Sequence, residues 1–295
     1  MQKKITIRSA TWITCGLATF VTLLLLEITG SDLKVKSFLP ITSMILLTFC
    51  VHVVYTKFRP VPLISRVSGG VTVLFWAVVI TGVATLAALR LNAPLIDADL
   101  ASIDEAFGVN TSVLVGWVAS HPVPAFLLNV AYKSTAPLVL AAVLALACMH
   151  QEKSMWELCL AFSGAGTSCI LISAMAPAVG AFVHYKISPD TLALLPKDSG
   201  VYHLPIFTEY RSGTPGAIEL EHMSGVVTFP SFHAAMAFMI GHAFRGLRWI
   251  SGPVWFWSGI MVISAIPIGG HYAVDLVAGV GVWAIFALFA RVRMP

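Results

Sequence analysis

Two histidines and one aspartate stand at the starts of apolar segments, where ionisable side chains are unusual. His233 lies in FPSFHAAMAF (residues 229–238), and His271 and Asp275 lie in GGHYAVDLVAG (residues 269–279). An ionisable residue in such a segment must reach water or find a partner, and by default it indicates a functional site. These three side chains are therefore the first candidates for chemistry.

The spacing of His271 and Asp275 suits them to act as a pair. They are four residues apart, so they share one face of a helix. A carboxylate at that spacing can accept a hydrogen bond from one imidazole nitrogen, which fixes the tautomer and leaves the other nitrogen as a directed nucleophile or base. His233, on a neighbouring helix, can then serve as the general acid for a leaving group.

The residues around the histidines are typical of an anion site. Ser231 stands where a helix-capping residue belongs, and the free N–H groups of a helix start attract phosphate. Gly270 allows the backbone to approach closely ahead of His271. The polar stretch 184–228 adds basic side chains, among which arginine has the better geometry for phosphate oxygens. The residues that we expect to contact a substrate phosphate are Arg211, Ser231, Gly270, Lys186 and Lys197.

Apolar helices are the elements that must position these residues. The chain has 295 residues, 58% of them hydrophobic and 11% charged, and its mean hydropathy is +0.87. A soluble domain is nearer half apolar and a quarter charged, so lipid must be the solvent for most of this chain. No segment alternates in polarity as the strands of a membrane barrel do. We therefore predict an all-α, polytopic transmembrane bundle.

About eight segments are apolar enough and long enough to span a bilayer, which takes roughly 20 residues. They are residues 11–29, 39–56, 70–90, 123–149, 157–183, 229–245, 252–268 and 271–290. The apolar piece TSVLVGWVA (residues 111–119) can form a ninth, interfacial helix, and the stretch 184–228 reads as an ordered cap or a loop. We divide the chain into N-terminal transmembrane helices (1–98) and a catalytic membrane domain (99–295).

The basic residues favour a cytoplasmic N-terminus, because cytoplasmic loops collect lysine and arginine. With this orientation the outer segments hold most of the acidic residues. Both termini are then cytoplasmic, and the histidines lie near the outer face, on the periplasmic, extracellular or lumenal side. The short inner segments contain Lys3, Lys4, Arg8, Lys57, Arg59, Arg66, Lys153, Arg245, Arg248, Arg291 and Arg293.

The two histidine motifs resemble those of a known family. PSFH and SAIPIGGHYAVDLVAG are similar to the second and third signature motifs of the type 2 phosphatidic acid phosphatase superfamily. FPSFHAAMAF together with GGHYAVD resembles the subgroup that contains the inositol phosphorylceramide synthases. The stretches YRSGTPG, SIDEAFGVN and NVAYKS also fit the layout of that subgroup, and the resemblance covers roughly residues 99–290.

The resemblance implies a metal-independent lipid phosphatase or phosphotransferase, with its phosphatase core in the C-terminal part of the bundle. His271 would attack phosphorus and form a phosphohistidine, Asp275 would orient His271, and His233 would protonate the departing alcohol. Water or an acceptor hydroxyl would then take the phospho group, which allows headgroup transfer between sphingolipids or phospholipids. No cofactor is expected. The expected partners are a lipid phosphate or phospholipid substrate and membrane lipids, and no nucleic acid.

Two departures from the family pattern concern the groups that hold phosphate. Ala265 stands where the family has an arginine after Ser264, and the first family motif, a lysine followed by an Arg-Pro pair, is absent from the outer loops. Arg211 is the best replacement, assisted by Lys186 or Lys197. Fewer fixed positive charges would suit a phosphodiester, with one negative charge, better than a monoester.

Two other readings stay open at this point. Two histidines and an aspartate are also an acceptable zinc set, which would make the protein a metal-dependent membrane hydrolase. Eight spans with buried polar groups also fit a transporter with no chemistry. The broken helices and pseudo-repeats expected of a transporter are not visible in the sequence.

Overall fold

A computed structural model describes residues 5–212, 216–223 and 225–293, and the protein is 76% helical. The described residues contain no strand, only an isolated bridge between Leu33 and Ile218. This confirms the predicted all-α class. Lys3 and Lys4 of the basic set and residues 213–215 of YRSGTPG lie outside the described residues.

All eight predicted segments form helices, but two of them are short. Within the described residues six helices are long and apolar enough to cross a membrane, so the protein is a multi-pass membrane protein by helix length and composition. They are α1 (Ile7–Thr29), α2 (Val35–Val53, continued by the π-helix η1, Val54–Phe58), α3 (Pro62–Leu89), α6 (Pro122–Cys148), α7 (Glu152–Met175) and α13 (Ala273–Arg293). The other two, α11 (Phe232–Ala243) and α12 (Arg248–Ser264), have 12 and 17 residues and are shorter than a standard span.

Local sequence sets several of the helix limits. Thr6 caps α1, because its hydroxyl accepts a hydrogen bond from the backbone N–H of Ser9 at 3.2 Å. Gly30 ends α1 in the left-handed conformation, at φ 58°. Pro62 and Pro122 begin α3 and α6 at a position where a missing N–H costs nothing.

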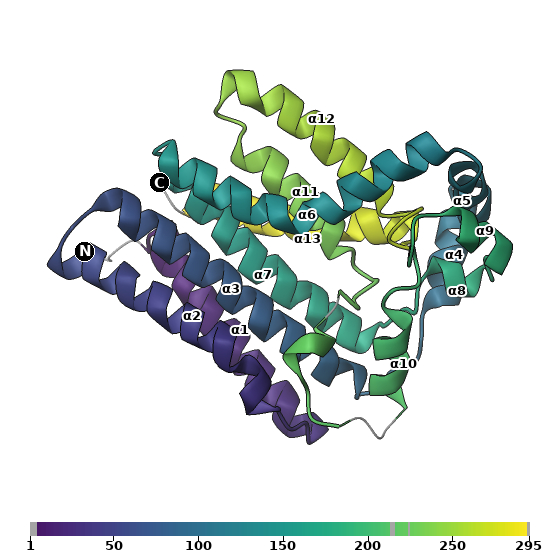
Figure 1. Ribbon diagram of the computed structural model, residues 1–295, viewed down its shortest axis with the longest axis horizontal. Helices are drawn as coiled ribbons and strands as arrows, with labels where there is room; N and C mark the ends of the chain where they lie inside the picture. Colours follow the sequence, from purple (N-terminus) through teal and green to yellow (C-terminus); the bar gives the residue numbers. More distant parts are fainter. Residues whose placement is uncertain (1–4, 213–215, 224, 294–295) are drawn as a thin grey trace.

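Helix α7 lies in the middle of the bundle, between α1–α3 on one side and α6 with α11–α13 on the other (Figure 1). Cys15 of α1, Val73 of α3 and Cys159 of α7 belong to one hydrophobic cluster of fully buried side chains. Packing is therefore continuous across the predicted boundary between residues 98 and 99. Large apolar side chains such as Phe20 and Leu47, each 65% exposed, cover the outside of the bundle, as expected for a surface in lipid.

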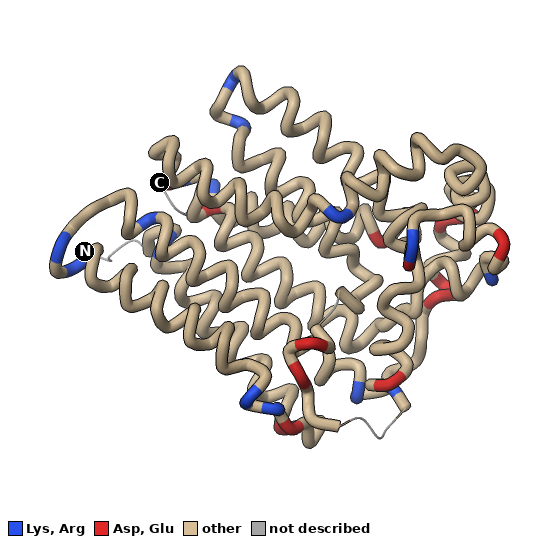
Figure 2. Tube along the Cα trace, in the orientation of Figure 1, with Lys and Arg blue, Asp and Glu red and all other residues tan. Residues whose placement is uncertain are grey.

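The small helices gather at one end of the bundle, opposite the start of α1 and the end of α13 (Figure 1). The helix predicted at residues 111–119 is present as α5. The described part of the stretch 184–228 contains two short α-helices and a 3-10 turn. Figure 2 shows that acidic residues are concentrated at this end, whereas basic residues occur at both ends. The small helices are α4 (Asp97–Ala106), α5 (Thr111–Ala119), α8 (Ala181–His184), α9 (Pro189–Leu194), α10 (Leu204–Arg211) and η2 (Leu220–His222).

Candidate active site

His271 and Asp275 are in contact, as their spacing predicts. The imidazole Nδ1 of His271 lies 3.2 Å from Oδ2 of Asp275, and both side chains are buried. The same carboxylate oxygen accepts a hydrogen bond from the backbone N–H of Tyr272 at 3.0 Å. His271 precedes α13, outside the spanning segments, and burial lowers its pKa to about 4. The ring is therefore neutral at neutral pH, and a hydrogen bond donated by Nδ1 to Asp275 would leave a lone pair on Nε2.

His233, in the first turn of α11, reaches the same place from another helix. Its ring centroid lies 6.2 Å from that of His271, and the two planes are inclined at 58°. On its other side His233 stacks on Tyr132 of α6, with centroids 4.3 Å apart and planes inclined at 14°. The hydroxyl of Tyr132 lies 3.1 Å from that of Tyr202. Stacking fixes the ring plane of His233 and leaves its edge free to face a substrate.

Ser231 joins the starts of α11 and α13. It is the N-cap of α11, and its Oγ accepts a hydrogen bond from the backbone N–H of Ala234 at 3.3 Å. The same Oγ lies 3.3 Å from Nε2 of His271, and the backbone N–H of Ser231 donates to the carbonyl oxygen of Asp275 at 3.0 Å. A Cβ atom at Gly279 would collide with the carbonyl oxygen of Ser231, so glycine is required there for this approach.

Two buried carboxylates of α4 hold the start of α13, and they were not among the predicted site residues. Asp104 accepts hydrogen bonds from the backbone N–H groups of Ala273 and Val274 at 2.7 and 2.9 Å. Asp97 accepts one from the hydroxyl of Tyr272 at 2.9 Å. The sequence did carry a signal: no Ser, Thr, Asn or Asp directly precedes Ala273, so the free N–H groups of α13 needed acceptors from elsewhere.

Gly270 contributes to the site through packing. Its φ is 77°, and a Cβ there would lie 2.9 Å from the Cα atom of Gly200. Its N–H donates to the carbonyl oxygen of Ile266 at 3.1 Å, and its own carbonyl accepts from the N–H of Ala181 at 2.9 Å. Both backbone groups of Gly270 thus have partners within the chain, and the residue fixes the turn that leads into His271.

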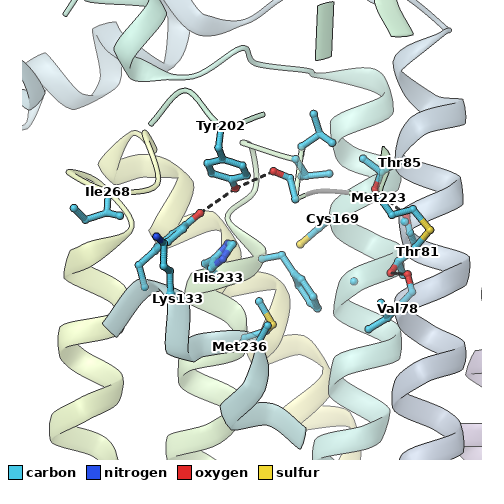
Figure 3. Close-up of a pocket in the computed structure, with 18 of the residues that line it drawn as sticks. Val78, Thr81, Thr85, Lys133, Cys169, Tyr202, Met223, His233, Met236 and Ile268 are labelled. Atoms are coloured by element: carbon cyan, nitrogen blue, oxygen red, sulfur yellow. Dashed lines mark hydrogen bonds between the residues drawn. The ribbon is translucent and has the colours of Figure 1, made fainter. Parts of the chain in front are cut away.

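A cavity of about 560 Å³ opens beside His233 (Figure 3). The sides come from α3, α6 and α7. The residues that cover it are Lys197, Asp198, Ser199, Tyr202, Met223, Gly225, Val226 and Val227. Phe232, His233 and Met236 of α11 line its inner side, whereas His271 lies behind them and is 3% exposed. The volume falls within the usual range of small-molecule pockets, about 300–1,000 Å³.

The structure brings some of the predicted basic residues to the cavity and not others. Lys197 lines it, as does Lys133 of α6, which was not among the predicted phosphate-binding residues. Lys186 is exposed beyond the end of α8 and does not line it. Arg211, at the end of α10, donates to the carbonyl oxygen of Ala93 at 2.8 Å and lies over the ring of Phe207. Lys133 and Lys197 are thus the two cations that line the cavity in the described part of the chain.

The zinc alternative has no ligand set in the described residues. Among them no group of three or more histidine, cysteine, aspartate or glutamate side chains is arranged to hold a metal ion. His271 and Asp275 are hydrogen bonded to each other in the arrangement of a base and its orienting carboxylate.

Fold and site together define a helical membrane protein with a paired-histidine centre at one end of the bundle. The family model described as the PAP2 superfamily matches residues 98–289, a range that contains His233, His271 and Asp275. The chain belongs to this superfamily of type 2 phosphatidic acid phosphatases, and the membership implies phosphatase-type activity on lipids. No curated protein and no solved structure matches the chain.

Proposed function

We propose that the protein cleaves a lipid phosphoester through a phosphohistidine on His271 and passes the phospho group to water or to an acceptor hydroxyl. The observation that carries this proposal is the meeting of His233 and His271 at the starts of two helices, with His233 lining a large cavity. Asp275 holds His271 in the tautomer that leaves Nε2 for attack.

The reaction proceeds in two displacements. Nε2 of His271 attacks phosphorus, the bond to the lipid alcohol breaks, and His233 donates a proton to the departing oxygen. His233 then removes a proton from the acceptor, whose oxygen attacks the phosphohistidine and frees His271. Asp275 stabilises the positive charge that develops on the His271 ring in each step.

The phosphate would lie at the start of α11. Ser231 Oγ already faces Nε2 of His271, and the helix start offers backbone N–H groups and a positive dipole end. Lys133 and Lys197 line the adjoining cavity and would neutralise phosphate oxygens. Arg211 and Lys186 stay predictions for this role, and reaching the cavity would require each of them to move from its observed position.

The outer side of the membrane is the proposed location of the site, with both termini in the cytoplasm. The connections α2–α3 and α11–α12, which carry Lys57, Arg59, Arg245 and Arg248, lie at the end of the bundle opposite the site (Figure 1). Acidic residues are concentrated at the site end (Figure 2). This distribution agrees with the preference of cytoplasmic loops for lysine and arginine.

The resemblance to the inositol phosphorylceramide synthase-like subgroup favours transfer over hydrolysis. Two lysines without an arginine at the cavity form a weaker clamp than the bidentate arginine of the family motif. A phosphodiester carries one negative charge and suits such a clamp better than a monoester. We therefore propose a phospholipid donor with a diester headgroup and an alcohol acceptor.

Purified protein offered radiolabelled phosphomonoester and phosphodiester lipids, with and without an acceptor alcohol, tests the function. We expect turnover of the diester, a product that incorporates the alcohol, and an acid-labile phosphoenzyme that the His271→Ala variant does not form. Turnover that EDTA abolishes and zinc restores would favour the metal-dependent hydrolase. Lipid flux across vesicles that persists in His271→Ala, without any turnover, would favour a transporter.

A further inference from the structure

Helix α3 contributes a complete wall to the cavity although it lies outside the region that matches the PAP2 superfamily. The wall consists of Val78, Thr81, Gly82 and Thr85, which follow one another at helical spacing and therefore share one face. The family match begins at residue 98. One side of the cavity that contains His233 is thus built by the N-terminal helices.

The α3 wall is apolar in effect, even though two of its residues are threonines. The hydroxyl of Thr81 donates to the carbonyl oxygen of Ala77 at 2.6 Å, and the hydroxyl of Thr85 donates to the carbonyl oxygen of Thr81 at 2.8 Å. A Cβ at Gly166 of α7 would lie 3.3 Å from the Cγ2 methyl of Thr81, so the methyl group is the part that meets α7. With their hydroxyls bonded within α3, both threonines present hydrocarbon to the cavity.

The cavity runs along α3 from near its C-terminal end towards its middle. Val78 and Thr85 are seven residues apart, about 10 Å along a helix axis. Val226 and Val227 lie next to Thr85, and Figure 3 shows Met236 on the side of the cavity formed by α11. Val78, near the middle of α3, lines the cavity and is 45% exposed.

A cavity lined by two exposed lysines and by an apolar wall on a helix that is long enough to cross a membrane fits one kind of molecule. We infer that the α3 wall binds a hydrocarbon tail of the substrate lipid and that Thr81 and Gly82 determine which tails the enzyme accepts. The inference rests on the proposed function for the identity of the headgroup. A tail here would pass between α3 and α6 beside Val78 while its phosphate lies near His233, and it would fill apolar space that is unfavourable to leave empty.

Steric limits identify the residues to change. Thr81 faces Gly166 across the narrow part of the cavity, so Thr81→Phe fills the space for the tail, whereas Thr81→Ser keeps it open. A Cβ at Gly82 would collide with the Cε atom of Met223, so Gly82→Ala displaces that side chain into the cavity. Leu46→Phe on α2 is a matched control, since Leu46 is 58% exposed and does not line the cavity.

Kinetics with long-chain and short-chain substrates of identical headgroup test the inference. We expect Thr81→Phe to lower kcat/KM for the long-chain lipid by about tenfold or more and to leave the short-chain ester within about twofold. Thr81→Ser and Leu46→Phe should behave like the wild type with both. An equal loss with both substrates, or no loss with either, would overturn the assignment.

A second measurement separates this inference from the proposed chemistry. A long-chain phosphate lipid with a diazirine near the end of its tail should crosslink to residues 78–85 in the wild type and in His271→Ala, because binding of the tail needs no turnover. Crosslinks confined to the lipid-facing surface of α1 and α2 would overturn the tail site. If the wild type turns over no phosphoester, the proposed function fails, while the position of the crosslink still decides the tail site.

Discussion

The two sides of the site are built differently. On the α13 side, buried carboxylates hold His271 and the helix start: Asp275 contacts the ring, and Asp97 and Asp104 of α4 accept hydrogen bonds from the residues that follow it. On the α6 side, Lys133 and Lys197 are exposed towards the cavity, and in the described part of the chain neither has a hydrogen-bond or ion-pair partner.

This difference separates two tasks within one site. The nucleophile must keep its orientation and its tautomer before substrate arrives. The α13 side, which is the fixed side, achieves this by hydrogen bonds within the chain. The groups that recognise the headgroup must exchange bound water for phosphate. The two unpaired lysines at the cavity, which form the open side, allow this exchange. Substitutions on the fixed side should therefore lower kcat and stability, whereas those on the open side should raise KM alone.

The largest effect is expected at the two histidines, and the leaving group separates their roles. His271→Ala should lower kcat/KM by about a thousandfold or more with any phosphoester, because no nucleophile remains. His233→Ala should lower it by about a hundredfold or more with an alkyl leaving group and by less than about tenfold with a nitrophenyl ester, whose leaving group needs no proton. Steady-state rates on both esters measure this.

Tyr55→Phe, on the π-helix η1 at the opposite end of the bundle, provides a control with both esters. Equal losses for His233→Ala on alkyl and nitrophenyl esters would contradict its role as general acid. Full activity of His271→Ala on either ester would remove the nucleophile from the fixed side altogether.

A smaller effect is expected at Asp104. Asp104→Ala leaves the N–H groups of Ala273 and Val274 without their acceptor, which costs about 1–3 kcal/mol of stability for each buried group left unpaired. We expect a lower thermal midpoint and a fall in kcat of about tenfold with little change in KM, because the start of α13 loses its anchor. Thermal unfolding in detergent and steady-state kinetics measure the two quantities.

Asp99, on the exposed side of the same helix, gives the matched control Asp99→Ala, which should leave both quantities unchanged. Asp104→Asn, which keeps one acceptor oxygen, should fall between the wild type and Asp104→Ala. A variant at Asp104 that loses stability and keeps full kcat would show that α4 supports the fold without positioning His271.

The sequence predicted only those residues of the fixed side that contact near neighbours in the chain. His271 precedes α13 and Asp275 lies in its first turn, so their contact follows from a spacing of four residues, and the capping position of Ser231 follows from its residue type. Asp97 and Asp104 act across more than 165 positions of the chain, and no local pattern pairs them with Tyr272, Ala273 and Val274.

The same limit applies to the helices and to the basic residues. Hydropathy located all eight helices, because apolar length is a property of a single segment. It overestimated the length of α11, which ends at Ala243, and it placed α12 at 252–268 although this helix spans Arg248–Ser264. Which cations reach the cavity depends on how α6, α10 and the stretch 184–228 fold over it. Residue type alone therefore favoured Arg211, while the fold brings Lys133 and Lys197 there.

The smallest effects are expected on the open side, and they decide which cations hold the phosphate. Lys133→Ala and Lys197→Ala should each raise KM for an anionic lipid by about three- to fivefold, with kcat and the thermal midpoint unchanged, since exposed charges contribute modestly. Arg211→Ala should change KM by less than about twofold, because its guanidinium is bonded to the carbonyl oxygen of Ala93. Initial rates over a range of substrate and salt concentrations measure these changes.

Salt dependence sharpens this last test. A phosphate held by Lys133 and Lys197 should bind more weakly as ionic strength rises, and each lysine variant should reduce that dependence, because one fewer charge is then available for screening. Lys186→Ala, at an exposed residue that does not line the cavity, is the control. If Arg211→Ala raises KM and flattens the salt dependence while both lysine variants remain like the wild type, α10 must move over the cavity when substrate binds. The open side would then be assembled by the substrate, whereas the fixed side is already in place without it.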